Sequence, residues 1–268
     1  MKLHASAFAL VPLLALLGAC ASTGGQGGGQ GSAPTPQRPR LSHNTQTTAA
    51  QTLELEGGVE VDPDDFIDTP MLLKYGITAQ TEFVFGGSPV RHNDATDDTG
   101  LGDVVLGARH RLVNETANDP AIAIATLIKL PTADAGDGLG TGETDVFFSL
   151  AAEKKIEDVQ AVAFYRMGFL GSPVADGNDV RHDLAAVGTV ALAQNLDVYG
   201  ELAGIFVPEN DIDSIFATFG GNFELGPSTV FDAGFRVGVT DDAPDFTFLF
   251  GITHNFGAGL LTPGSSGK

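Results

Sequence analysis

The chain has 268 residues, of which 43% are hydrophobic, and its 34 Asp and Glu against 14 Lys and Arg give a formal charge of −20. A nucleic acid is a polyanion that needs a basic footprint, so this charge excludes nucleic acid as a partner. The ordinary apolar fraction excludes global disorder, and the single Cys excludes an internal disulfide and a thiolate metal cluster.

The N-terminus has the pattern of an export signal. A positive charge precedes an apolar run that is too short to span a bilayer, and the run ends in Leu17-Gly18-Ala19-Cys20. This ending resembles the bacterial lipobox, whose Cys is acylated and becomes the first residue of the mature protein. We therefore interpret residues 1–19 as a lipoprotein signal peptide and Cys20 as the lipidation site. The alternative is an ordinary signal peptide cleaved nearby. Ala21 after the Cys resembles the pattern sorted to the outer membrane of Gram-negative bacteria.

Residues 20–50 are predicted to be the lipid anchor followed by a disordered tether. The stretch is rich in Gly, Gln, Ser and Pro, and residues 1–50 hold no Asp or Glu. No apolar periodicity begins before Leu53, so nothing in this stretch predicts a packed element.

From Leu53 onward the hydrophobic pattern has period two, which is typical of strands with one apolar and one polar face. In the last such segment Phe246, Phe248 and Phe250 alternate with Thr247 and Leu249. Most segments have the length of about 9–11 residues that a tilted strand needs to cross a bilayer. Twelve segments are predicted: 52–61, 69–77, 80–87, 100–113, 119–130, 143–154, 158–170, 180–193, 196–206, 212–225, 228–240 and 245–256.

The connections between these segments are alternately short and long. Short periplasmic turns and longer external loops are typical of outer-membrane barrels. We therefore predict an all-β fold over residues 51–256, a transmembrane antiparallel up-and-down β-barrel of about 12 strands. An even strand count places both ends of the barrel domain in the periplasm, and residues 257–268 are predicted to form a flexible C-terminal tail.

Charged side chains indicate which face lines the lumen. A Lys or Arg facing lipid at mid-depth costs about 2–4 kcal/mol, and most of the Lys and Arg lie opposite the Phe and aliphatic rows. We expect a mixed-charge lumen in which Arg109, Arg111 and Lys129 pair with Asp103 and Asp145. A soluble periplasmic barrel with its apolar rows inside, binding an apolar ligand, would show the same alternation. The predicted lumen-lining residues are Lys74, Glu82, Asp103, Arg109, Arg111, Lys129, Asp145, Arg166, Glu201, Asp232 and Arg236.

Acidic residues cluster in the predicted external loops. Divalent cations bridging them to lipopolysaccharide are conceivable, but the spacing fits no Ca²⁺ loop, so we expect solvated loops and no metal site. The predicted loop carboxylates are Asp62, Asp64, Asp65, Asp94, Asp97, Asp98, Asp241 and Asp242.

No other motif predicts chemistry. His182 and Asp183 with Ser149 or Ser214 suggest an acyl hydrolase, but neighbouring residues of a strand face opposite sides and cannot pair through that adjacency. We expect no enzyme activity and no cofactor.

Four stretches carry a family resemblance. They are residues 69–78 (TPMLLKYGIT), 98–109 (DTGLGDVVLGAR), 127–132 with 140–145 (LIKLPT and GTGETD), and 250–256 (FGITHNF). Together they resemble the outer-membrane barrel family called "putative MetA-pathway of phenol degradation", across nearly the whole barrel. The resemblance implies a porin-like barrel that passes aromatic or other small hydrophobic compounds.

These observations favour a lipid-anchored outer-membrane β-barrel that forms a passive channel or uptake pore for small molecules. The alternatives are a non-conducting structural or surface lipoprotein, with a lumen filled by its own ion pairs, and the soluble barrel. The expected partners are outer-membrane lipids and lipopolysaccharide, the barrel assembly machinery and a small-molecule solute.

Overall fold

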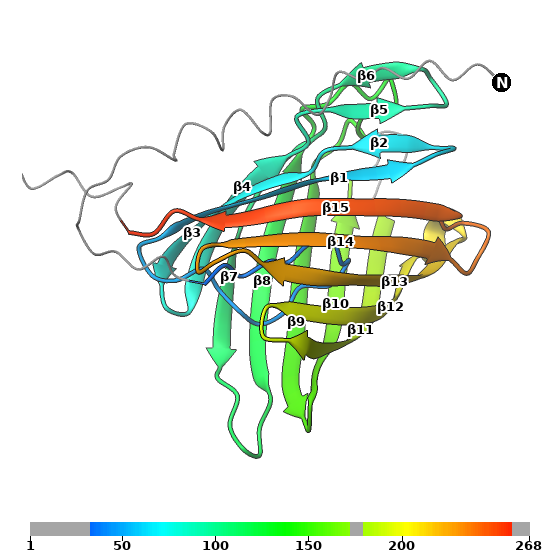
Figure 1. The fold of residues 1–268 in the computed structure, drawn as a ribbon. Helices are drawn as coiled ribbons and strands as arrows, with labels where there is room; N and C mark the ends of the chain where they lie inside the picture. The colour runs from blue at the N-terminus through cyan, green and yellow to red at the C-terminus, as the bar shows by residue number, and fades with distance from the viewer. Residues whose placement is uncertain (1–32, 172–178, 259–268) are drawn as a thin grey trace, which may run out of the picture.

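The computed structural model describes residues 33–171 and 179–258, and nearly all regular structure in them is β (Figure 1). Twelve long strands pair antiparallel with their neighbours in chain order, and β15 pairs with β1 to close the sheet into a barrel. This confirms the predicted fold. The barrel strands are β1 (Leu53–Asp62), β3 (Met71–Thr78), β4 (Thr81–Gly87), β7 (Val104–Val113), β8 (Ala121–Leu130), β9 (Asp145–Ile156), β10 (Val159–Leu170), β11 (Asp179–Ala193), β12 (Leu196–Val207), β13 (Ile212–Glu224), β14 (Thr229–Gly238) and β15 (Phe246–Asn255).

Three short strands extend the sheet beyond the barrel at the end that carries the long loops. They are β2 (Phe66–Asp68), β5 (Arg91–Asn93) and β6 (Asp98–Gly100), and they lie above β1 in Figure 1. The last residues of β1 pair with β2, whereas β3 pairs only with the first half of β1. The sequence predicted loops here, which was wrong because three-residue strands are too short to show a period.

The outer face of the barrel carries the Phe and aliphatic rows. In β15, Phe248 and Phe250 are 42% and 54% exposed, whereas Thr247, Leu249 and Thr253 are fully buried inside. The same sorting holds for Phe83 and Phe85 of β4. A soluble barrel would invert this arrangement, so the soluble alternative is wrong. In the described residues no helix is long and apolar enough to span a membrane.

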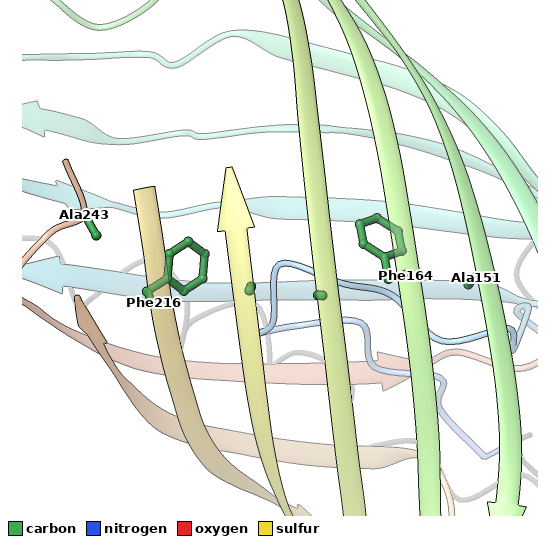
Figure 2. Packing of buried hydrophobic residues seen from close by; sticks show 6 residues of the cluster. Ala151, Phe164, Phe216 and Ala243 are labelled. Atoms are coloured by element: carbon green, nitrogen blue, oxygen red, sulfur yellow. The ribbon is translucent and has the colours of Figure 1, made fainter. Parts of the chain in front are cut away.

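The inner wall divides into two sectors. From β8 to β13 one cross-strand row is apolar, and each of its members pairs directly with the next. Phe164 and Phe216 carry the rings of this row, and Figure 2 shows them on their strands with Ala151 and the loop residue Ala243. The row consists of Ala123, Ala151, Phe164, Ala185, Ala203 and Phe216. In this sector the predicted charged residues of the lumen therefore lie on either side of an apolar row that the sequence did not predict.

Residues 33–50, here called the lumenal plug, run inside the barrel rather than leaving it as a free tether (Figure 1). Thr45 and Thr48 of the plug are fully buried. The prediction of a disordered tether was wrong for these residues, because they pack against the barrel wall and not against a core of their own. The signal peptide, Cys20, the rest of the predicted tether and residues 259–268 of the predicted tail lie outside the described residues.

Candidate functional site

The plug is bound to the barrel wall mainly through its own backbone. At five places one or two plug N–H groups donate to an inward-facing glutamate, at intervals of about three residues. The bonds are Thr35 N to Glu54 (3.1 Å), Gln37 N to Glu56 (2.9 Å), Leu41 N and Ser42 N to Glu201 (both 3.0 Å), Thr45 N to Glu153 (2.9 Å) and Thr48 N to Glu82 (2.6 Å). Because these donors are main-chain groups, the wall binds the plug more through its backbone than through its side chains.

Two of these glutamates depend on the plug. Glu153 on β9 and Glu201 on β12 are 5% and 3% exposed, and neither has a basic partner within the described residues. Both oxygens of Glu201 accept from the plug, which includes the Ser42 hydroxyl at 2.7 Å, and Oε2 of Glu153 accepts from the Thr45 N–H and from the Thr45 hydroxyl at 2.5 Å. A buried carboxylate without donors is costly, so the plug and these two side chains stabilise each other.

Arg38 anchors the plug to β1. Its guanidinium forms an ion pair with Glu60 at 2.9 Å, and its backbone N–H donates to Glu56. The guanidinium lies against Gly58, where an added Cβ would be only 2.5 Å from its Nη2 atom and 2.3 Å from the Phe250 carbonyl. The close approach of Arg38 therefore requires glycine at position 58.

The sector from β1 to β7 is held by buried ion pairs. Lys74 lies between Glu54 and Glu56, 2.6 Å from each, and all three side chains are fully buried. Lys74 also donates to the Thr35 carbonyl of the plug at 2.8 Å. Arg109 pairs with Glu82 at 3.1 Å.

Other predicted lumen residues form contacts closer to the long-loop end. Lys129 pairs with Asp145 at 2.7 Å and with Asp103 at 3.1 Å. Burial opposes ionisation of Asp103, but the backbone N–H of Ala133 and the Lys129 ammonium together lower the pKa of this loop carboxyl. Arg166 pairs with Asp183 at 2.5 Å.

The remaining predicted lumen residues differ from the expected pairing. Arg109 pairs with Glu82 instead of the two expected aspartates, and Arg111 donates to the Ala79 carbonyl and to Gln46 of the plug. Both expectations were wrong, because Glu82 lies directly opposite Arg109 on β4, and because the plug and the turn at Ala79 lie next to Arg111. Arg236 lies 3.9 Å from Glu60 and over the Phe216 ring, whereas neither carboxylate oxygen of the buried Asp232 has a partner in the described structure.

Two cavities flank the plug. The larger, of about 650 Å³, lies at the short-turn end, and its wall carries the carboxylates of Glu115, Glu153, Asp197 and Glu224. The Lys155 backbone N–H, which donates to Glu115, lowers the pKa of that exposed carboxyl. The smaller cavity, of about 160 Å³, lies between plug residues 37–43 and the wall, toward the long loops.

The predicted loop carboxylates lie at the long-loop end. Most are exposed, but Asp62 is a buried member of β1, so its assignment to an exposed loop was wrong. Partial burial and the neighbouring Asp62 and Asp64 raise the pKa of Asp65. No group of three metal-ligating side chains is found among residues 33–171 and 179–258.

The suggested hydrolase residues are not assembled. His182 bonds to the Tyr165 hydroxyl on the outer face, whereas Asp183 pairs with arginines inside. Ser149 does contact a histidine, the plug's His43, at 2.9 Å. The other ring nitrogen of His43 has no partner in the described structure, so no acid orients the pair.

Sequence reasoning missed the plug residues altogether. The available signal was charge, because Arg38 and Arg40 stand in a stretch without Asp or Glu ahead of a barrel whose inner face is rich in carboxylates. Opposite charge on two segments indicates that they can associate, although it does not fix the path.

A closed barrel with an apolar outer face and a polar interior defines the class of outer-membrane β-barrels, and the fold is similar to that of solved outer-membrane proteins. The COG4313 outer membrane channel from Pseudomonas putida F1 has a TM-score of 0.65 at 12% identity, covering 81% of this chain and 100% of that one. The NanC porin has a TM-score of 0.54 at 11% identity, covering 75% and 98%. The KdgM porin, solved in complex with disordered oligogalacturonate, has a TM-score of 0.53 at 9% identity, covering 76% and 98%.

The sequence also matches a family directly. Residues 25–256 match the family described as "Putative MetA-pathway of phenol degradation", and the chain belongs to that family. The match begins before the first strand and therefore includes the whole plug. No curated protein sequence matches the chain significantly.

Proposed function

We propose that this protein is a lipid-anchored outer-membrane channel for the passive uptake of small molecules, with a lumen that the plug keeps narrow. The observation that carries the proposal is a barrel with an apolar outer face and a polar interior, crossed by a segment held through hydrogen bonds. The family and the three related channels support a non-enzymatic transport role.

Conductance in a planar bilayer tests the proposal. Purified full-length protein is expected to give small discrete current steps, and proteoliposomes are expected to swell in small neutral solutes. Silent bilayers together with non-swelling liposomes would contradict a channel. That result would favour the second candidate, a non-conducting surface lipoprotein, which the filling of the lumen by the plug specifically suggests.

The membrane anchor has a separate test. Acylation of Cys20 would hold the start of the chain in the inner leaflet, and 13 residues of extended chain can span up to about 45 Å to reach the plug. Wild-type protein is expected to incorporate labelled palmitate, whereas Cys20→Ser is not. The barrel is expected to insert in both cases, because its apolar belt is far larger than one lipid anchor.

Orientation is tested with epitope insertions. We expect a tag at residues 93–96 or 135–138 to be accessible on intact cells. A tag at residues 114–118 is expected to become accessible only after permeabilisation. The reverse pattern would place the long loops in the periplasm.

A further inference from the structure

The smaller lumenal cavity has the size of a single ring. Its volume of about 160 Å³ is close to that of an engineered protein cavity of about 150 Å³ that binds benzene. One side is aliphatic, formed by Leu72, Val84, Val105 and Leu127 from four different strands. This side favours an apolar, compact body over a hydrated ion.

Charge in the cavity has one sign. Arg38, Arg40, Lys74, Arg109 and Arg166 line it, and no carboxylate does. Four of these side chains have carboxylate partners on the wall behind them, at 2.5 to 3.1 Å. Arg40, which borders the larger cavity as well, has no ion-pair partner within the described residues and lies over the Tyr199 ring at 5.4 Å.

Several donors at this cavity lack acceptors. The Nε and Nη2 atoms of Arg38 and the Nε atom of Arg109 have no hydrogen-bond partner in the described structure, although both residues are at most 8% exposed. Buried polar groups are normally paired, so unpaired donors around an open space indicate a missing acceptor. An ammonium group would be repelled here, and a neutral hydrocarbon would leave the donors unpaired.

We propose that this cavity is a binding site for a small organic anion with a single apolar ring, of which an aromatic carboxylate is the simplest member. The ring lies against the aliphatic side, and the carboxylate accepts hydrogen bonds from the basic side, with Arg40 as its main counter-charge. The site rests on the proposed function, because it lies in the lumen between the plug and the wall, and it names the class of solute that the lumen retains.

Calorimetric titration of the full-length protein in detergent tests the site with three probes of equal size. Benzoate is expected to bind, benzyl alcohol to bind about tenfold more weakly or worse, and benzylamine not to bind. Arg40→Gln is expected to lower the affinity for benzoate by about tenfold. Arg91 lies on β5, away from the cavity, so Arg91→Gln is expected to leave the affinity unchanged. Equal binding of benzoate and benzyl alcohol would overturn the proposal.

A second variant tests the aliphatic side of the cavity without changing its basic residues. Leu127→Phe fills the aliphatic side without removing a basic group, so it is expected to abolish benzoate binding. Retained benzoate affinity in both Arg40→Gln and Leu127→Phe would place the anion elsewhere and overturn the site. Because the titration does not need transport, benzoate binding by a protein that fails to conduct would leave the site standing while the channel fails. Conductance without benzoate binding would support the channel and overturn the binding site.

Discussion

The two sectors of the lumen wall hold the plug in different ways. In the sector from β1 to β7 the glutamates that bind the plug also have basic partners on the wall, such as Lys74 and Arg109. In the sector from β8 to β13, Glu153 and Glu201 each lie two residues along the strand from an alanine of the apolar row. The hydrogen bonds that these two carboxylates accept in the described structure come from the plug. Glu54, Glu56 and Glu82 therefore keep a basic partner on the wall when the plug leaves, whereas Glu153 and Glu201 lose the partners that the described structure gives them.

The apolar row adds a second difference. Leu41 of the plug packs against the cluster formed by Phe164, Phe216 and their alanine neighbours. The plug thus places one aliphatic side chain and two backbone N–H groups at the same part of the wall. Opening of the channel should be controlled mainly from this sector, and barrel stability mainly from the other.

Deletion of residues 34–48 is the largest perturbation of this arrangement. Without the plug, the lumen loses its main obstruction, and single-channel conductance is expected to rise several-fold in planar bilayers. A variant in which the same residues are replaced by an equally long Gly/Ser stretch is the matched control. It keeps the backbone donors, so it should conduct less than the deletion but more than wild type. Unchanged conductance of the deletion would show that the plug does not limit permeation.

Lys74→Met tests whether the sector from β1 to β7 determines the stability of the barrel. The change leaves Glu54 and Glu56 buried without their counter-charge, which typically costs about 3–5 kcal/mol. The unfolding midpoint in urea should fall accordingly. Phe164→Leu in the apolar sector is the comparison, and it should lower the midpoint less, because it removes only part of a ring and leaves no buried charge unpaired. Equal midpoints for the two variants would contradict the claim that the sector from β1 to β7 contributes more to barrel stability.

Glu201→Gln tests control of opening. The amide retains one acceptor but loses the charge, and a hydrogen bond to a charged group contributes about 1.5–3 kcal/mol, or roughly tenfold or more in the fraction of time open. Single-channel recordings should therefore show longer open times, with a smaller fall in the unfolding midpoint than Lys74→Met causes. Glu224→Gln, an exposed carboxylate at the end of β13, is the control and should leave the open fraction as in wild type. A larger effect from Glu224→Gln than from Glu201→Gln would show that the larger cavity at the short-turn end controls opening.

The barrel could be predicted from sequence because each of its strands is long enough to display a period. All twelve segments, and the outward position of the Phe rows, depend on alternation within one stretch of chain. The plug could not be predicted in this way, since its backbone bonds go to Glu56, Glu153 and Glu201, up to 160 positions away. The ion-pair partners were partly wrong for the same reason, because register across strands and the path of the plug decide them.

The smallest expected effect lies at the long-loop rim, outside both sectors. Like-signed charge at a mouth concentrates counter-ions within a Debye length of about 8 Å at physiological salt, so the acidic loops should give weak cation selectivity. Replacing Asp94, Asp97 and Asp98 with Asn should reduce it in reversal-potential measurements across a salt gradient, and high salt should have the same effect. An unchanged preference would place the selectivity determinant in the lumen.

The pH dependence of this preference has a definite sign. Neighbouring Asp134 and Asp98 raise the pKa of Asp137, and partial burial and nearby aspartates raise the pKa of Asp65. A carboxyl with a raised pKa loses its charge at a higher pH than an ordinary aspartate. As pH falls, cation selectivity should therefore begin to decline before ordinary aspartates titrate, while the wall ion pairs persist. Asp65→Asn combined with Asp137→Asn should remove this early part of the decline. Burial also raises the pKa of Asp68 on β2, so Asp68→Asn is added to the variant. If the early decline survives in the triple variant, the titrating charges lie within the barrel and the rim does not cause the cation selectivity.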